Sequence, residues 1–233
     1  DEAIRVAVEQ HNEVCRLIRA IGDFRKEANP RVTGYEFHIL TLVSYVAPKH
    51  LIVDKLRETL EEIKTREPDA ADKYRARVVF VGSEVDDVDV IRLVEESGAY
   101  VCADRFCYGS LPGRDEILLN DDEDVVKQVC RQVQGRAQCP RYWDMAKMTG
   151  RRDYVADLAK EYGADGIIYE QMKFCDPWAY ERMIGTIVLR DEHGYPVLAV
   201  DRPYSIGSSG QMRTRFQAFV ESIEIKKIQG GKK

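Results

Sequence analysis

One cysteine lies where a thiol could do chemistry. Residues 166–169 form a short apolar run that predicts a buried parallel strand, and Cys175 follows just before Asp176-Pro177, a pair typical of a helix start. In open α/β sheets, ligands bind outside the carboxyl ends of the strands. We therefore expect Cys175 either to ligate a metal ion or to attack a substrate.

The histidines help to choose between these two roles. A nucleophilic cysteine needs a nearby base, most often a histidine. His193, the histidine nearest to a strand end, is expected at the opposite edge of the sheet. The scattered histidines also match no metal-ligand spacing. Metal ligation is therefore the better role for the Cys175 thiol.

Two loops are expected at the same edge of the sheet as Cys175. Residues 104–110 follow the second predicted strand and carry a charge pair, a thiol, Gly and Ser, although an ordinary loop with an unreactive cysteine fits equally well. Residues 205–211 combine small side chains with a helix start, which favours an anion, and the alternative is a flexible loop with a serine N-cap. The candidate substrate-binding residues are Arg105, Cys107, Ser208, Ser209, Gly210 and Gln211.

The other cysteines predict no local metal cluster. Cys15 and Cys130 fall in helical patterns and Cys102 falls in a strand, so we expect all three to be structural. Cys139 begins an aromatic and cationic loop, 139–143, which we interpret as pocket lining rather than as packing under the next helix, and we do not expect Cys139 to be a ligand. No CxxC pair and no zinc or ferredoxin spacing occurs. Free thiols in a chain of this size predict a reducing cytoplasm.

Helices are expected before any strand. Apolar residues at helical spacing predict helices at about 1–28, 33–45 and 48–66. Thr33, followed by Glu36, matches a capping box. Because the chain opens inside a helical pattern without Met, we expect a missing upstream part. We divide the chain into a helical connecting segment, 1–75, and an α/β lobe, 76–233.

The lobe alternates strands and helices. Strands are predicted at 78–81, 99–103, 166–169 and 196–200, with helices at 87–97, 121–133, 151–162, 177–190 and 211–225. Strands joined through helices by short loops predict a parallel sheet with right-handed crossovers. The expected fold class is α/β, a Rossmann-like or flavodoxin-like sheet of about four strands with helices on both faces. The turn at Gly82-Ser83 lacks the G-x-G-x-x-G pattern, which disfavours a nicotinamide cofactor.

The composition disfavours two classes of partner. The 233 residues carry a net charge of −5, whereas a nucleic-acid binder usually carries a basic patch. No apolar run approaches the ~20 residues that span a membrane. We therefore expect a cytoplasmic protein with no nucleic-acid or membrane partner.

Several motifs, taken together, resemble one family. They are VGSEVDDVDVIRLVEESGAYVCADRFCYGS, CPRYW, EQMKFCDPWAYE and PVLAVDRPYSIGSSGQMRTRFQAFVE, in this order over about residues 76–226. This set resembles the 2-hydroxyacyl-CoA dehydratase and ATP-dependent benzoyl-CoA reductase family, which includes the D-component of 2-hydroxyglutaryl-CoA dehydratase. The segment before residue 76 would join the two similar lobes of such a subunit.

The resemblance implies a cofactor, partners and a role for Cys175. The cysteine of the family's K-F-C-D motif is one ligand of a [4Fe–4S] cluster held between the lobes, which carries over to Cys175, and the other cysteine ligands belong to the amino-terminal lobe. Members pair with a homologous second subunit and receive electrons from an ATP-hydrolysing iron–sulfur activator. The substrate is a CoA thioester, reduced by one-electron steps through a radical.

Within the family, the motifs favour the benzoyl-CoA reductase branch. Residues 175–182, 201–204 and 210–215 look more like reductase subunits than dehydratase subunits. The leading hypothesis is thus an iron–sulfur subunit that helps to reduce an aryl-CoA ester. A 2-hydroxyacyl-CoA dehydratase subunit with the same cluster is the first alternative. A non-catalytic subunit that binds a CoA ester or assembles a partner is the second.

Overall fold

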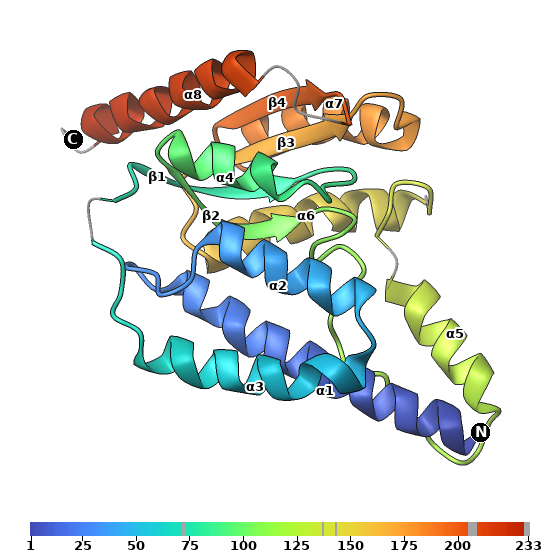
Figure 1. The fold of residues 1–233 in the computed structure, drawn as a ribbon. Coiled ribbons are helices and arrows are strands. Elements are labelled where there is room, and N and C mark those ends of the chain that lie inside the picture. The colour runs from blue at the N-terminus through green and yellow to red at the C-terminus, as the bar shows by residue number, and fades with distance from the viewer. Residues whose placement is uncertain (71–72, 137, 143, 205–208, 231–233) are drawn as a thin grey trace.

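The computed structural model describes residues 1–70, 73–136, 138–142, 144–204 and 209–230, and it has the expected α/β architecture (Figure 1). Helices precede the first strand, and strands and helices then alternate. In chain order the elements are α1 (Glu2–Asp23), the 3-10 helix η1 (Phe24–Lys26), α2 (Gly34–Val46), α3 (Lys49–Thr65), β1 (Ala76–Val81), α4 (Val88–Glu96), β2 (Ala99–Arg105), α5 (Val125–Arg136), α6 (Met145–Glu161), β3 (Gly166–Met172), α7 (Asp176–Asp191), β4 (Val197–Arg202) and α8 (Ser209–Gly230).

The sheet has four strands in the order β2-β1-β3-β4, and every pairing is parallel. The central strands are almost continuously apolar because helices cover both faces. On one face, α4 and α8 pack through Val94 and Phe216 against Phe80. On the other face, α6 and α7 pack through Ala159 and Trp178. The prediction of four parallel strands with helices on both faces is confirmed.

The strands extend further at their carboxyl ends than the sequence predicts. The predicted strands stop at residues 103, 169 and 200, whereas β2 continues through Arg105, β3 through Met172 and β4 through Arg202. Polar side chains that end an apolar run usually indicate a loop. Asp104, Glu170 and Arg202 stay in strands because they form ion pairs with residues distant in sequence. The predicted loop at 104–110 therefore begins two residues later than expected.

Glu170 is the centre of the polar contacts at these strand ends. Its side chain is 0% exposed, and its Oε2 accepts hydrogen bonds from the backbone N–H (3.0 Å) and the hydroxyl (2.9 Å) of Ser83, which follows β1. Its Oε1 forms an ion pair with Nε of Arg202 in β4, at 2.9 Å. A Cβ at Gly82 would lie 2.5 Å from the Glu170 carbonyl oxygen, so only glycine permits this close approach. Glu170 therefore joins the ends of β1, β3 and β4.

The helices α1–α3 share a third apolar core and also contact the sheet. Thr33 caps α2 in a complete capping box with Glu36, as predicted. Beyond this core, α2 packs on α4 and on the edge strand β2, and Arg25 of η1 forms a buried ion pair with Asp104 of β2 (3.1 Å). In Figure 1 these helices lie together on the β2 side of the sheet. Each helix in the described part of the chain is either too short or too polar to traverse a bilayer.

His38 of α2 packs against Phe106, the residue that follows β2. Its imidazole is 3% exposed and packs edge-on against Phe106, with ring centroids 5.0 Å apart. Burial lowers the pKa of His38 to about 4, against the opposing attraction of Asp104. The imidazole is therefore neutral at neutral pH.

We expect Glu170→Ala to lower the free energy of unfolding by about 3–5 kcal/mol, because it leaves the buried charge of Arg202 without a carboxylate, with backbone carbonyls as its remaining partners, and leaves both donors of Ser83 without an acceptor. Burial raises the pKa of Glu170 to about 7, so the neutral amide of Glu170→Gln should cost less than alanine. Urea denaturation at pH 7 measures both. The matched control is Glu224→Ala, which breaks an exposed ion pair with Arg75 and should cost at most ~1 kcal/mol. Equal costs for Glu170→Ala and the control would contradict the assigned role.

His38 makes a separate contribution to the pH dependence of stability. Because its pKa is near 4 in the folded chain and near 6.5 when unfolded, the unfolded state binds the proton first. The stability due to neutral His38 is complete above pH 6.5 and is lost as the pH falls towards 4, by at most about 3 kcal/mol. The free energy of unfolding of the wild type minus that of His38→Leu should be smaller at pH 5 than at pH 7.5, because only the wild type loses the contribution of His38. A difference that does not vary with pH would contradict a buried neutral imidazole.

Candidate functional site

Cys175 lies beyond the carboxyl end of β3 and is the N-cap residue of α7. Hydrogen bonds fix the chain up to this point: the Met172 N–H donates to Ser83 Oγ (2.6 Å) and the Lys173 N–H to the Arg202 carbonyl (2.8 Å). The Cys175 N–H then donates back to the Met172 carbonyl (3.1 Å). The thiol is thus held at the edge where the sequence predicts it. The contacts that hold it belong to the Glu170 network.

Phe174 makes the turn that presents this thiol. It is the one described non-glycine residue with positive φ, at 72°, a conformation that is rare for large side chains. Its ring is 95% exposed and contributes nothing to the apolar core. Strained backbone of this kind persists where the surrounding structure fixes it, and it concentrates at functional sites.

Two further thiols lie near Cys175. Cys107, from the loop after β2, and Cys139, from the loop before α6, pack with Cys175 against the apolar cluster that contains Trp178. Burial raises the pKa of Cys107 to about 12, and the neighbouring thiols act in the same direction. Burial also raises the pKa of Cys175, opposed by the Trp178 backbone N–H and by Arg141. Across residues 1–70, 73–136, 138–142, 144–204 and 209–230, no three metal-ligating side chains are placed to hold a metal ion.

A cavity of about 500 Å³ opens beside Cys175. Its wall is largely apolar and comes from the start of α7, from α6 and from Pro140 and Arg141 of the predicted aromatic loop. Buried Arg151 holds this loop in place, because it donates to the Gln138 carbonyl (2.7 Å) and pairs with Glu181 of α7 (2.7 Å). The prediction that this loop lines a pocket is confirmed for Pro140 and Arg141, and Trp143 lies outside the described residues.

The structure separates the remaining predicted residues. Arg105 lies inside β2 rather than in a loop, and its buried guanidinium stacks on Tyr154 at 4.2 Å, away from the cavity beside Cys175. Ser208 lies outside the described residues. Ser209, Gly210 and Gln211 form the first turn of α8, and Gly210 and Gln211 are exposed. The substrate-binding roles of these residues remain predictions.

Three expectations about individual side chains are also resolved. Cys15 and Cys102 are buried free thiols, as expected of structural cysteines. Cys130 is exposed on α5, so the prediction that it is structural is wrong. The helix that carries Cys130 turns this position to solvent because its buried face is formed by Val125 and Gln128.

Sequence reasoning missed the roles of Glu170, Arg202 and Ser83. All three lie within the quoted motifs, but no local pattern marks them, and the ion pair joins strands that are separated in sequence by the whole of α7. The one local signal is a charged residue, Glu170, directly after a buried apolar run, which requires a partner if the strand continues.

As a whole, the arrangement can present one anchored thiol at a helix N-terminus, next to an apolar cavity and an exposed aromatic ring. Thiolates are ligands of iron–sulfur clusters. At Cys175 the helix N-terminus and Arg141 favour the anionic form, against the burial that raises the pKa of the thiol. One thiol is not a complete ligand set, so the donor chemistry of Cys175 fits a cluster only together with ligands from outside the described residues.

Comparison with known proteins gives a consistent picture. The sequence model described as 2-hydroxyglutaryl-CoA dehydratase, D-component, matches residues 1–223, so the match includes the helical segment before β1. The chain is 26% identical over 225 residues to the beta subunit of (R)-phenyllactyl-CoA dehydratase from Clostridium sporogenes, covering 96% of this chain and 58% of that protein. It is 22% identical over 230 residues to one of the subunits of benzoyl-CoA reductase from Thauera aromatica, covering 97% and 58%.

A third relative is the beta subunit of (R)-2-hydroxyglutaryl-CoA dehydratase from Acidaminococcus fermentans, 26% identical over 180 residues, which cover 74% of this chain and 46% of that protein. The chain thus spans about half the length of these relatives. Their names describe subunits of enzymes that act on CoA esters, both reductases and dehydratases. Because the family model matches almost the whole chain, the chain belongs to the 2-hydroxyglutaryl-CoA dehydratase D-component family.

Proposed function

We propose that this chain is part of an iron–sulfur subunit of an enzyme that transforms a CoA thioester, and that Cys175 is one ligand of its [4Fe–4S] cluster. The observation that carries the proposal is the position of Cys175, anchored at the N-terminus of α7 beyond the carboxyl end of β3. Membership of the D-component family supports the substrate class. The remaining ligands would come from outside residues 1–233, and a homologous subunit and an ATP-hydrolysing activator would be the partners.

The residues around Cys175 have separable roles in this proposal. When bound, the cluster supplies one-electron chemistry at the thioester. The Glu170 network holds the backbone that presents the thiol, and the neighbouring cavity, with Pro177, Tyr180 and Ile184 in its wall, offers an apolar surface for the acyl group. Exposed Phe174 would offer an aromatic contact to the substrate at the same edge.

Reduction of an aryl-CoA ester is the reaction we favour. It rests on the sequence of residues 175–182 and 201–204, and a relative named as a benzoyl-CoA reductase subunit supports it. Dehydration of a 2-hydroxyacyl-CoA ester is the second candidate, supported by relatives named as dehydratase subunits. The reactions differ in electron demand, because the reductase consumes two electrons per turnover whereas the dehydratase recycles its electron.

We expect Cys175→Ala to lose the cluster. The full-length subunit, purified without oxygen, should contain iron and acid-labile sulfide and give a cubane EPR signal after reduction. The matched control is Cys130→Ala, which removes an exposed thiol on α5 and should leave iron content and the signal unchanged. Unchanged iron and EPR signal in Cys175→Ala would refute the ligand role, and a metal-free wild type would favour a subunit that only binds a CoA ester. Turnover of benzoyl-CoA against 2-hydroxyacyl-CoA, with reductant consumption recorded, then separates the two reactions.

We expect Phe174→Gly to preserve folding while lowering activity. Glycine removes a left-handed strain of roughly 1–2 kcal/mol but adds roughly 0.5–1 kcal/mol of freedom to the unfolded chain, so the free energy of unfolding should stay equal or rise by about 1 kcal/mol. Loss of one aromatic contact should lower kcat/KM for the CoA ester by about tenfold. Denaturation and steady-state kinetics measure the two effects. Full activity in Phe174→Gly would contradict a role for the ring.

A further inference from the structure

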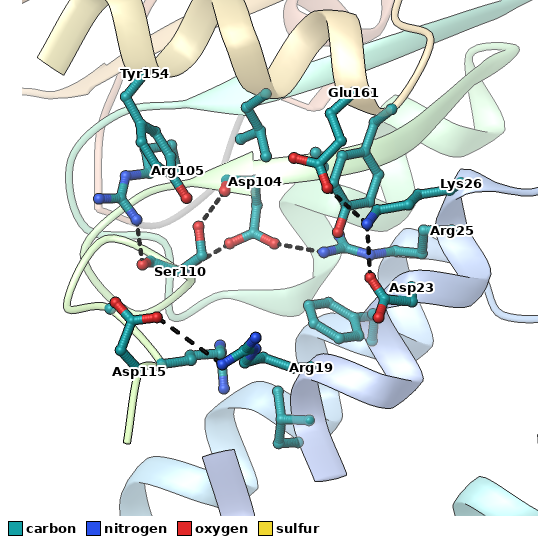
Figure 2. Close-up of a pocket in the computed structure, with 18 of the residues that line it drawn as sticks. Arg19, Asp23, Arg25, Lys26, Asp104, Arg105, Ser110, Asp115, Tyr154 and Glu161 are labelled. Atoms are coloured by element: carbon teal, nitrogen blue, oxygen red, sulfur yellow. Dashed lines mark hydrogen bonds and ion pairs between the residues drawn. The ribbon is translucent and has the colours of Figure 1, made fainter. Parts of the chain in front are cut away.

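A second cavity, of about 490 Å³, lies between α1 and η1, the end of β2, the loop at 110–115 and α6 (Figure 2). It shares no lining residue with the cavity beside Cys175. Its volume is within the range of small-molecule sites. The proposed function leaves this cavity unused.

The wall of this cavity carries an excess of positive charge. Six cationic side chains face four carboxylates; the cations are Arg19, Arg25, Lys26, Arg105, Arg114 and Arg136, and the carboxylates are Asp23, Asp104, Asp115 and Glu161. The carboxylates pair with the first three cations. The guanidinium groups of Arg105, Arg114 and Arg136 donate to neutral carbonyl or hydroxyl oxygens, but they pair with no carboxylate in the described part of the chain. The wall therefore has a surplus of about two positive charges.

Arg105 is the exception among the buried arginines of the described residues. Arg25 pairs with Asp104, Arg202 pairs with Glu170, and the remaining two, Arg151 and Arg152, share Glu181. Arg105 is only 4% exposed and donates to the Ser110 carbonyl, but it forms no ion pair with any described carboxylate. A buried cation without an anion is costly, and burial accordingly lowers the pKa of Arg105.

Donor groups in the wall also lack acceptors. The Nε atoms of Arg25, Arg105 and Arg114 are buried and have no hydrogen-bond partner among the described residues. Figure 2 shows Arg105 beside Tyr154 and Arg25 directed at Asp104, which lies between the two arginines. Buried unpaired donors of this kind are rare in folded proteins and indicate a missing partner.

We propose that this cavity binds the phosphate groups of a phosphate-bearing small molecule, held by Arg105, Arg114 and Arg136. Guanidinium groups recognise phosphate oxygens through paired N–H donors, and a phosphate monoester or diphosphate carries the charge that balances the surplus in the wall. The rings of Tyr154 and Tyr162, which also line the cavity, give the organic part of the ligand a flat apolar surface. The phosphates of CoA and those of a separate nucleotide are the two sources of this chemistry.

Calorimetric titration of the full-length subunit tests the site, with pyrophosphate, ADP, CoA, 3′-dephospho-CoA and the phosphate-free fragment pantetheine as ligands. The wild type should bind pyrophosphate and ADP or CoA, and should not bind pantetheine. Arg105→Gln and Arg136→Gln should each weaken binding by at least tenfold, and Arg105→Lys by less. Arg131→Gln, which removes an equal charge from the exposed surface of α5, is the matched control and should bind as the wild type does.

The outcomes separate this proposal from the proposed function. Absence of binding to every phosphate ligand, or wild-type affinity in both Arg105→Gln and Arg136→Gln, would overturn the site. If Arg105→Gln does not fold by circular dichroism, Arg114→Gln and Arg136→Gln, at less deeply buried positions, decide. CoA affinity that falls when the 3′-phosphate is removed supports CoA as the source, whereas equal binding of ADP and pyrophosphate supports a separate ligand. Loss of the cluster in Cys175→Ala is measured by iron content, so neither result depends on the other.

Discussion

The buried carboxylate of Glu170 is the constraint on which the geometry of the carboxyl edge depends. A carboxylate with 0% exposure requires compensation, and three partners on two neighbouring segments supply it: the N–H and hydroxyl of Ser83 and the guanidinium of Arg202. Burial and these partners oppose each other in setting the pKa of Glu170, which lies at about 7 because burial prevails. The residue thus holds three strand ends together, at the cost of a desolvated acid.

The same contacts determine where the thiol lies. Ser83 Oγ also accepts the N–H of Met172, and the Arg202 carbonyl accepts the N–H of Lys173, so the chain is fixed to within two residues of Cys175. The positive φ of Phe174 then turns the chain into α7. Arg151 of α6 and Glu181 of α7 have a similar positioning role, because their contacts fix the loop that lines the neighbouring cavity. Cys175 is therefore positioned by side chains that fix the backbone before it and do not contact the thiol.

Sequence patterns predicted the elements well because their signals are local. Each signal is formed by residues only a few positions apart. Examples are the apolar runs of β1 and β3, the Thr33 capping box and the helix start after Cys175. The polar strand ends were missed because their partners are remote: Arg25 and Asp104 are separated by 79 residues. The position of Cys175 at the sheet edge could be predicted from β3 alone, whereas its supporting contacts require the strand order.

The strand order also explains why the helical segment is more than a connection. Because β2 is an edge strand, its outer side is open to α1, η1 and α2, and the segment contacts it through the Arg25–Asp104 ion pair and the bond from the Tyr100 hydroxyl to the Val32 carbonyl (2.8 Å). The second cavity exists only because this segment packs there, since η1 and α1 form one of its walls. Glu170 is matched with Arg202, and Asp104 with Arg25, each across an element boundary, but Arg105 lies beside Asp104 with no carboxylate of its own. The boundary between the helical segment and the sheet therefore contains a paired buried charge, Arg25, and an unpaired one, Arg105. Only the unpaired charge would be stabilised by a bound anion.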